Sequence, residues 1–343
     1  MSEGMIRLGV LGCGSIARRF LPWFAEHPAL RVTAVASRDR ARAADLVGSL
    51  GGAGAGTDAV EGYARLLARD DVDAVYICLP TGLHADWSLR AIQAGRHVLV
   101  EKAMATRYAE AAAMTAAAEA AGLQLWENRM FTHHGQHDRV RRLVAEGAVG
   151  TPRVVASGMA IPPRPAGDIR LSRPLGGGAL LDTGFYALHG ALLFLDQNVE
   201  VVGASLVGGV EPDDVDLGGA ALLRDGAGLL AHTTFGFQHS SRSYYELWGS
   251  EGRLVVERAF TTPADLAPVV TLERGGHVER LGWPPENPFA AFLTAFGAAV
   301  RGELDGGPQA DTGLRGARLL EAVRQSAARP APLRPPRTRS EIS

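Results

Sequence analysis

Residues 6–17 read IRLGVLGCGSIA, a short apolar run followed by a glycine-rich turn and the start of an amphipathic stretch. Gly12, Gly14 and Ala17 have the spacing G-x-G-x-x-A. The first glycine permits a tight turn from strand to helix, the second lets the backbone approach a pyrophosphate, and the alanine lets the helix pack close to the strand. The helix N-terminus would direct its free N–H groups at the anion. We therefore predict a dinucleotide site, with Gly12, Gly14, Ser15 and Ile16 as binding residues.

The end of the second apolar run indicates which dinucleotide is bound. An NAD site usually has an acidic residue here, which binds the ribose 2′-hydroxyl. This sequence has Ser37 and Arg38, with Arg42 one helical turn later. A hydroxyl and two guanidinium groups suit a 2′-phosphate, so NADP(H) is favoured over NAD(H). Two alternatives stay open: a shift of one residue would bring the acidic Asp39 into the site, or the two arginines are merely solvated.

The first 128 residues alternate apolar runs with amphipathic stretches. Runs rich in Val, Ile and Leu predict buried strands, and the stretches between them predict helices. This alternation is typical of a parallel sheet with helices on both faces. The predicted strands are 6–11, 31–36, 74–79, 97–100 and 123–126, and the predicted helices are 17–27, 40–50, 63–68, 85–94 and 108–121.

After Gly150 the pattern changes to strands separated by turn residues, with a hairpin signal at Asp225-Gly226. This half predicts an α+β domain with an open-faced, largely antiparallel sheet. The predicted strands are 154–159, 199–207, 215–223, 228–235, 244–248 and 253–257, and the predicted helices are 136–146, 178–195, 289–301 and 314–328. The expected domains are a dinucleotide-binding domain (1–128), a substrate-binding and oligomerisation domain (129–285), C-terminal helices that return toward the first domain (286–329) and a tail (330–343).

The composition excludes several classes of function. A length of 343 residues predicts two domains. A net charge of -2 gives no broad basic face for nucleic acid or a membrane surface. Two cysteines cannot form a disulfide framework or a four-ligand metal site. The apolar run near the N-terminus is too short for a signal peptide or a membrane span, so we expect a cytoplasmic protein.

Several motifs together resemble the Gfo/Idh/MocA oxidoreductase family, and the resemblance covers nearly the whole chain. Each motif is modest alone, but the ordered set is highly specific. The sequence is most similar to the nucleotide-sugar 3-ketoreductases of deoxysugar biosynthesis within this family. The family motifs are residues 79–84 (LPTGLH), 100–103 (VEKA), 176–189 (GGGALLDTGFYALH) and 249–252 (GSEG); the narrower resemblance rests on residues 131–137 (FTHHGQH) and 161–170 (IPPRPAGDIR).

The resemblance implies a Rossmann domain joined to an open-faced sheet, with the cofactor between them. It also implies that the sheet forms the interface of a homodimer or homotetramer, and that the substrate is a sugar linked to a nucleotide such as dTDP. Asn128, at the end of the last predicted Rossmann strand, is a further candidate contact to the nicotinamide. The implied cofactor-binding residues are Leu79, Pro80, Thr81, His84, Glu101 and Lys102.

Transfer of a hydride to a carbonyl leaves negative charge on the oxygen. A proton donor must therefore lie within hydrogen-bonding distance of that oxygen. The family has His or Tyr at position 186, and Tyr186 is therefore the candidate donor. A nearby ammonium favours the phenolate, so Lys102 is expected to lower the pKa of Tyr186. Asp182, four residues earlier, would share its helical face and orient the substrate or Tyr186. His189 also falls on this face, but we do not predict it to be catalytic.

Other residues complete the expected pocket. A diphosphate would favour guanidinium groups, so Arg164 and Arg170 are candidates, although either could simply be exposed. Ala103 stands where the family usually has proline, which predicts a strained or altered turn after Lys102. The histidines 133, 134 and 137 have a spacing that could hold a metal, but we expect no metal because the proposed chemistry needs none. The further substrate-binding candidates are Asp168, Asp182, Tyr244 and Trp87.

The leading hypothesis is an NADPH-dependent reductase of the C3 carbonyl of a nucleotide-linked keto-deoxysugar. Two other functions remain open. One is an NADP-dependent dehydrogenase of free sugars or trans-dihydrodiols, which the tyrosine-bearing branch of the family also includes. The other is a dinucleotide-binding regulatory protein without turnover, although Lys102 and Tyr186 argue against it.

Overall fold

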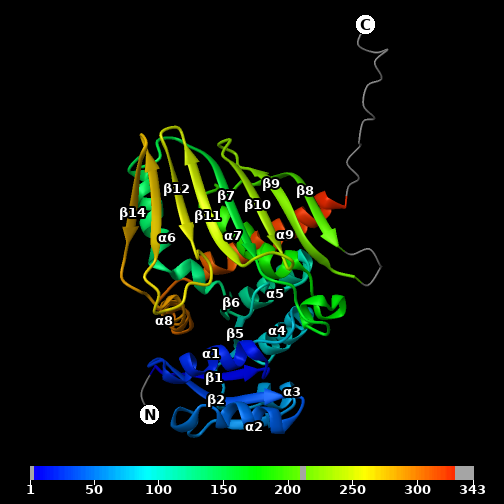
Figure 1. Ribbon diagram of the computed structural model, residues 1–343. Helices are drawn as coiled ribbons and strands as arrows, with labels where there is room; N and C mark the ends of the chain where they lie inside the picture. Colours follow the sequence, from blue (N-terminus) through cyan, green and yellow to red (C-terminus); the bar gives the residue numbers. More distant parts are fainter. Residues whose placement is uncertain (1–3, 209–213, 329–343) are drawn as a thin grey trace, which may run out of the picture.

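The computed structural model describes residues 4–208 and 214–328 of the chain. These residues form two sheets, a smaller one near the N-terminus and a larger one on the other side of a layer of helices (Figure 1). Within these ranges, no helix combines the length and the apolar character that crossing a bilayer requires. The predicted tail, residues 330–343, lies outside the described part of the chain.

The smaller sheet has the strand order β3-β2-β1-β4-β5-β6, and all of its neighbouring strands are parallel. This is the Rossmann arrangement, so the predicted parallel domain is confirmed. The strands are β1 (Ile6–Leu11), β2 (Leu30–Ser37), β3 (Asp58–Glu61), β4 (Ala74–Ile77), β5 (His97–Val100) and β6 (Leu125–Glu127). The helices between them are α1 (Ser15–Glu26), α2 (Arg40–Gly48), α3 (Tyr63–Leu67), α4 (His84–Gln93) and α5 (Tyr108–Ala120).

The larger sheet has the order β14-β13-β12-β11-β7-β10-β9-β8. Only β7 and β10 form a parallel pair among these described strands, so the predicted, largely antiparallel sheet is also confirmed. Its strands are β7 (Pro152–Ala160), β8 (Glu200–Gly208), β9 (Asp216–Arg224), β10 (Leu230–Gly236), β11 (Arg242–Gly249), β12 (Gly252–Glu257), β13 (Val269–Arg274) and β14 (His277–Gly282). Helix α6 (Gly135–Ala145) precedes this sheet in the chain.

Three strands are missing from the predicted set: β3, β13 and β14. All three lie at or next to a sheet edge, and β3 and β14 are mostly half-buried or exposed. Their sequences DAVE, VVTLER and HVERLG carry charged residues where a buried strand would be apolar. Edge strands of this kind give no continuous apolar run, so hydrophobic periodicity does not detect them.

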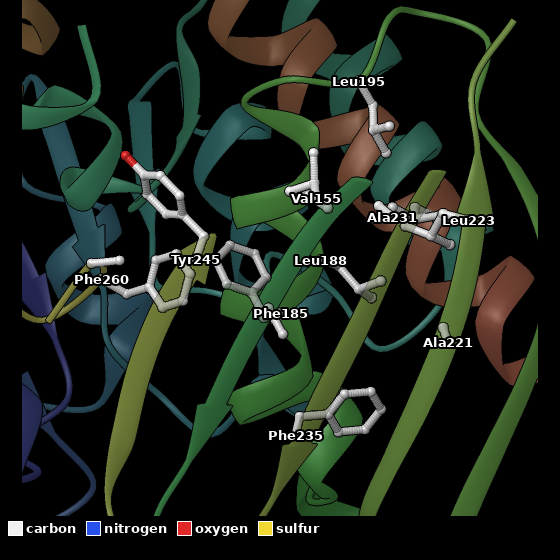
Figure 2. Close-up of a cluster of buried hydrophobic side chains, with 14 of the residues drawn as sticks. Val155, Phe185, Leu188, Leu195, Ala221, Leu223, Ala231, Phe235, Tyr245 and Phe260 are labelled. Carbon is white, nitrogen blue, oxygen red and sulfur yellow. The ribbon is translucent and has the colours of Figure 1, made fainter. Parts of the chain in front are cut away.

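Helix α7 (Phe185–Leu192) packs across one face of the larger sheet, against β7, β10 and β11. Figure 2 shows the buried side chains at this contact, among them Phe185 and Leu188 of the helix and Val155, Phe235 and Tyr245 of the sheet. The helix is preceded by a π-helical turn, Leu180–Gly184. The predicted helix over 178–195 is therefore a π turn that continues into a shorter α-helix. Packing against the sheet fixes α7, and with it the residues on its opposite face.

The last two helices connect the domains. Helix α8 (Pro288–Val300) buries Phe289, Phe292 and Phe296 against the Rossmann domain, where Phe289 stacks on Phe20 with ring centroids 4.4 Å apart and Phe296 lies edge-on to Trp126 at 5.6 Å. Helix α9 (Gly307–Ala327) packs against α5 and β6 of the first domain and against α7 and β8 of the second (Figure 1). Aromatic and apolar burial of this kind is the dominant stabilising contribution in such interfaces.

Candidate active site

A cavity of about 570 Å³ lies where the Rossmann sheet meets the segment that leads into α7. Its walls come from the carboxyl ends of β1, β2, β4 and β5, which is where open α/β sheets bind ligands, and from residues between Arg164 and Asp182. The size is typical of a cofactor site. The predicted site residues that line the cavity are Gly12, Gly14, Ser15, Ile16, Ser37, Arg38, Arg42, Leu79, Pro80, Thr81, Glu101, Lys102, Arg164, Asp168, Arg170 and Asp182.

The glycine-rich turn has the geometry that a pyrophosphate needs. Gly12 has φ of 116°, a left-handed conformation, and a Cβ here would lie 3.0 Å from the carbonyl oxygen of Cys78. A Cβ on Gly14 would meet no atom within 4 Å, so this glycine borders open space in the cavity. Gly14 precedes α1 and offers no capping side chain, so the first N–H groups of α1 are available to an anion.

The part of the cavity formed by the end of β2 and the start of α2 carries positive charge. Arg38 and Arg42 are exposed on its wall. The Asp39 carboxylate instead accepts a hydrogen bond of 2.8 Å from the Ala41 N–H and caps α2. Because this carboxylate is engaged in the cap, it does not stand among the groups that line the cavity. The side chains present therefore fit a phosphate on the ribose better than a free 2′-hydroxyl.

Lys102 follows β5 and reaches the cavity. The Lys102–Ala103 peptide bond is cis, so the turn keeps a cis bond without proline. The ammonium forms an ion pair with the Asp182 carboxylate and donates a hydrogen bond of 3.2 Å to the Asp182 carbonyl oxygen. Burial would lower the pKa of Lys102, but Asp182 and Tyr186 outweigh burial and raise it. Lys102 is therefore a cation at neutral pH.

Alternating charges continue from Lys102 toward the far side of the cavity. Arg170 donates to Asp182 at 2.7 Å and contacts Asp168 at 3.3 Å, and Asp168 pairs with Arg164 at 2.7 Å. Burial would raise the pKa of Asp182, but the Lys102 ammonium and the Arg170 guanidinium hold it at about 2. With three cations and two carboxylates, this row carries a net positive charge that favours an anionic ligand.

Tyr186 lies at the start of α7, half-buried among the rings of Phe131, Phe185 and Phe260. The Lys102 ammonium sits over its ring, 4.8 Å from the centroid. The Lys102 charge lowers the pKa of Tyr186, as expected, but burial has the larger effect, so the net pKa of Tyr186 is raised. Tyr186 is therefore a neutral phenol with a proton to donate. Its side chain lies next to the cavity-lining Lys102 rather than on the wall itself.

Two predicted cofactor-binding residues point elsewhere. The Asn128 side-chain amide donates to Glu101 at 2.6 Å, and the Tyr76 hydroxyl donates to the same carboxylate oxygen at 2.5 Å. His84 is fully buried, with its ring nitrogens 2.8 Å from the carbonyl oxygens of Leu79 and Ala103. Neither Asn128 nor His84 lines the cavity. Both instead support residues that do, Glu101 and Leu79.

Two predicted substrate-binding residues do not belong to this cavity. Tyr244 is on β11, where side chains alternate between the two faces of the sheet. Its neighbour Tyr245 is buried against α7, so Tyr244 is on the open face, under the guanidinium of Arg242. Trp87 does not line the cavity. It lies edge-on to the cavity-lining Tyr63, with ring centroids 5.0 Å apart.

The histidines have structural partners. His137 is bonded to the Tyr245 hydroxyl at 3.0 Å, His133 contacts Gln309 at 3.2 Å, and His134 caps α6. No group of three or more His, Cys, Asp or Glu side chains with metal-binding geometry occurs in residues 4–208 and 214–328. His189 bonds to the Phe185 carbonyl oxygen at 2.8 Å and faces α9, so it does not share the cavity with Asp182.

Sequence reasoning missed part of the lining. Cys13, inside the glycine turn, and Cys78, after β4, both line the cavity as buried free thiols. Their positions next to predicted residues are the signal that could have found them. Tyr63 has no such signal, because β3, which delivers it to the cavity, was itself missed. Ile169 is also a cavity-lining residue that was not predicted. It lies between the predicted residues Asp168 and Arg170, and its side chain is 49% exposed.

The arrangement can bind an extended anionic ligand and protonate an oxygen. The glycine turn with Arg38 and Arg42 suits the phosphates of a dinucleotide, and Arg164 and Arg170 suit a second phosphate group. The same cavity holds the Lys102 ammonium, and the neutral phenol of Tyr186 lies against it. Such donors, held in a partly buried site, stabilise charge that develops on a reacting oxygen.

Comparison with known proteins agrees with this geometry. Residues 6–129 match the model of an oxidoreductase family with an NAD-binding Rossmann fold, and residues 137–255 match the GFO/IDH/MocA C-terminal domain. A dTDP-3,4-didehydro-2,6-dideoxy-alpha-D-glucose 3-reductase from Actinomadura kijaniata is 46% identical over 94% of this chain and 96% of its own length. A 3-ketoreductase from the same organism, solved with NADP and TDP-benzene, aligns with a TM-score of 0.90 at 44% identity over 94% of this chain and 98% of that chain.

A more distant relative extends the range of chemistry. A D-xylose 1-dehydrogenase (NADP(+)) from Haloferax volcanii is 32% identical over 85% of this chain and 88% of its own length. The matched family models, the identity over most of the chain and the shared two-sheet fold lead to one conclusion, which also confirms the resemblance and the predicted enzyme class. The chain belongs to the Gfo/Idh/MocA oxidoreductase family.

Proposed function

We propose that this enzyme uses NADPH to reduce the C3 carbonyl of a dTDP-linked keto-deoxysugar. The observation that carries the proposal is one cavity with three functional regions. The cavity is lined by the glycine turn with Arg38 and Arg42, by Lys102, and by Arg164 and Arg170, and Tyr186 lies against Lys102. The dTDP-sugar reductase that is 46% identical to this chain supports the substrate class.

The cofactor, when bound, supplies a hydride from its nicotinamide ring. Gly12, Gly14 and the N-terminus of α1 would bind its pyrophosphate, and Arg38 and Arg42 its 2′-phosphate. The complex of the 44% identical 3-ketoreductase with NADP supports this choice of cofactor.

The chain's own contribution to catalysis is proton transfer and charge. The Tyr186 hydroxyl would give its proton to the carbonyl oxygen of the substrate as charge develops there. The Lys102 ammonium, over the Tyr186 ring, would stabilise the resulting phenolate. Asp182 holds this ammonium in place and keeps it protonated. Arg164 and Arg170, across the cavity, would bind the diphosphate of the substrate.

The open face of the larger sheet supports assembly into a homodimer or homotetramer. Leu222, Leu230 and Trp248 are 41%, 37% and 62% exposed. Cross-strand pairing places them on one face, since Trp248 and Leu230 both pair with Val154, while Leu222 pairs with His232, two residues after Leu230. Apolar side chains exposed together on a sheet are typical of an interaction surface.

The function is tested by steady-state oxidation of NADPH with a dTDP-linked 3-keto sugar. We expect turnover with this substrate and none with unlinked xylose or glucose and NADP. Turnover with the free sugars alone would instead support a sugar dehydrogenase, an alternative that the 32% identical xylose dehydrogenase favours. NADPH binding with no turnover on any sugar would support a regulatory protein.

The substitution Arg42→Ala should weaken the binding of NADPH without affecting the binding of NADH. Loss of one charge-assisted hydrogen bond to phosphate removes about 1.5–3 kcal/mol, so the KM for NADPH should rise about tenfold or more. The KM for NADH should stay unchanged, because NADH has no 2′-phosphate. Arg40→Ala is the matched control: Arg40 is on the same helix but bonds to the Ala59 carbonyl oxygen at 3.2 Å. An equal rise in KM for NADPH and NADH would contradict the assignment of Arg42 to the 2′-phosphate.

Tyr186→Phe should lower kcat about 10²–10⁴-fold, the usual contribution of a positioned acid, with NADPH affinity unchanged. The phenylalanine keeps the aromatic packing against Phe131 and Phe260, so folding should be preserved. Single-turnover NADPH oxidation measures the step directly. If Tyr186→Phe turns over at the normal rate, the proton comes from another group, and Lys102→Met then tests the ammonium.

Asp182→Asn should shift the alkaline limb of the pH–rate profile to lower pH. Asp182 makes the largest contribution that raises the pKa of Lys102 against burial, so its removal lowers this pKa and Lys102 loses its proton at lower pH. The acid limb should not move, because the pKa of Asp182, about 2, lies below the assay range. If the alkaline limb does not move in a folded Asp182→Asn variant, that limb does not report the titration of Lys102.

A further inference from the structure

One helix, α9, contacts the supports of both Lys102 and Tyr186, although these residues come from different domains. The contacts are made by two glycines one turn apart, Gly313 and Gly316, both buried. We propose that α9 is a positioning element that sets the distance between the Lys102 turn and the Tyr186 helix. This inference rests on the proposed function, since it assigns a role to the spacing of the two groups.

On the first side, α9 packs against the residues that hold the Lys102 turn. The Met104 N–H, two residues after Lys102, donates to the Glu127 carboxylate at 2.7 Å. Glu127 also accepts from Arg129 at 2.8 Å, and Arg129 donates to the Gln309 carbonyl oxygen of α9 at 2.6 Å. The Arg129 and Glu127 side chains are only 1% and 3% exposed. Breaking this buried ion pair would leave an uncompensated charge, which favours the intact link.

Gly313 permits this approach. A Cβ on it would lie 2.9 Å from the Arg129 guanidinium and 3.3 Å from the Met104 sulfur. A second contact lies further along the same helix, where Arg324 donates to the Thr106 carbonyl oxygen at 3.1 Å. The stretch that follows Lys102 is therefore fixed to α9 at two points.

On the second side, α9 packs against the helix that carries Tyr186. A Cβ on Gly316 would collide with the His189 ring, coming within 2.6 Å of Cε1. This ring cannot easily move, because it is bonded to the Phe185 carbonyl oxygen at 2.8 Å and packs at a tilt of 32° against the Phe185 ring, with centroids 4.0 Å apart. Burial and the Arg129 charge lower the pKa of His189 to about 3, so it packs as a neutral ring.

The two contacts connect α9 to both segments that carry the candidate catalytic groups. The Rossmann sheet carries Lys102, and the larger sheet carries α7 with Tyr186. Glycine at both positions lets one rigid helix approach both groups closely. Within the described residues, the cavity lining includes no residue of α9, so the helix affects spacing without touching the ligand site. A shift of about 1 Å between reacting groups can cost about a hundredfold in rate.

Gly316→Ala tests the proposal, because its methyl group must push α7 away from α9. We expect kcat to fall about tenfold or more, while the dissociation constant of NADPH, measured by fluorescence, stays within about twofold. Hydrogen exchange should rise in residues 101–106 and 180–189. The double variant Gly316→Ala/His189→Ala removes the colliding ring and should recover most of the lost kcat. Gly48→Ala is the matched control, since a Cβ there meets no atom within 4 Å and kcat should stay unchanged.

A folded Gly316→Ala protein with normal kcat would overturn the proposal. Loss of NADPH binding in parallel with kcat would also overturn it, and so would a double variant that does not recover kcat. If Gly316→Ala does not fold, Gly313→Ala is judged by kcat, NADPH binding and hydrogen exchange against the same criteria. If the wild-type enzyme reduces no dTDP-linked keto sugar, the proposed function fails. The hydrogen-exchange comparison then still decides whether α9 controls the two segments.

Discussion

The ion pair between Lys102 and Asp182 is the contact on which the site depends. It joins a residue at the end of the Rossmann sheet to a residue in the π-helical turn before α7, so it also joins the two domains. The side chains are only 13% and 21% exposed, and neither charge is well solvated alone. Removing Asp182 would leave the partly buried Lys102 ammonium without its carboxylate partner. The pair therefore fixes both the charge state and the position of the ammonium.

The rest of the cavity follows from this pair. Asp182 also binds Arg170, and Arg170 contacts Asp168, so the position of Lys102 is linked to the far wall of the cavity. The carboxylates neutralise part of the positive charge and orient the arginines, yet an excess of positive charge remains. A substrate with a diphosphate and a reactive carbonyl would complete this electrostatic pattern. Packing of α9 against both domains then keeps the ammonium and the phenol at a fixed separation.

The sequence predicted the dinucleotide turn and the carboxyl-end residues because their position follows from topology alone. Gly12, Gly14, Arg38 and Lys102 each come directly after a predicted strand, and parallel strands deliver such residues to one edge. The prediction for Tyr244 was wrong because one residue of strand register decides which face a side chain occupies. Tyr244 and Tyr245 are adjacent and identical in type, so hydrophobicity alone does not show that Tyr245 is the buried one.

Other features could not be read from the sequence because they depend on long-range contacts. Lys102 lies over the Tyr186 ring as expected, but its hydrogen bonds to Asp182, 80 residues away in the chain, were not predicted. Asn128 and His84 were expected at the cofactor, yet neither lines the cavity, and each bonds to a residue that does. Polar residues next to a site satisfy whichever buried partner is nearest, and only the fold determines that partner.

The most direct measurement is a crystal structure of this enzyme with NADP⁺ and thymidine diphosphate. We expect the 2′-phosphate of the adenosine against Arg38 and Arg42, the nicotinamide beside Lys102 and Tyr186, and the thymidine diphosphate against Arg164 and Arg170. Density for the nicotinamide ring away from Lys102, or for thymidine diphosphate outside this cavity, would contradict it.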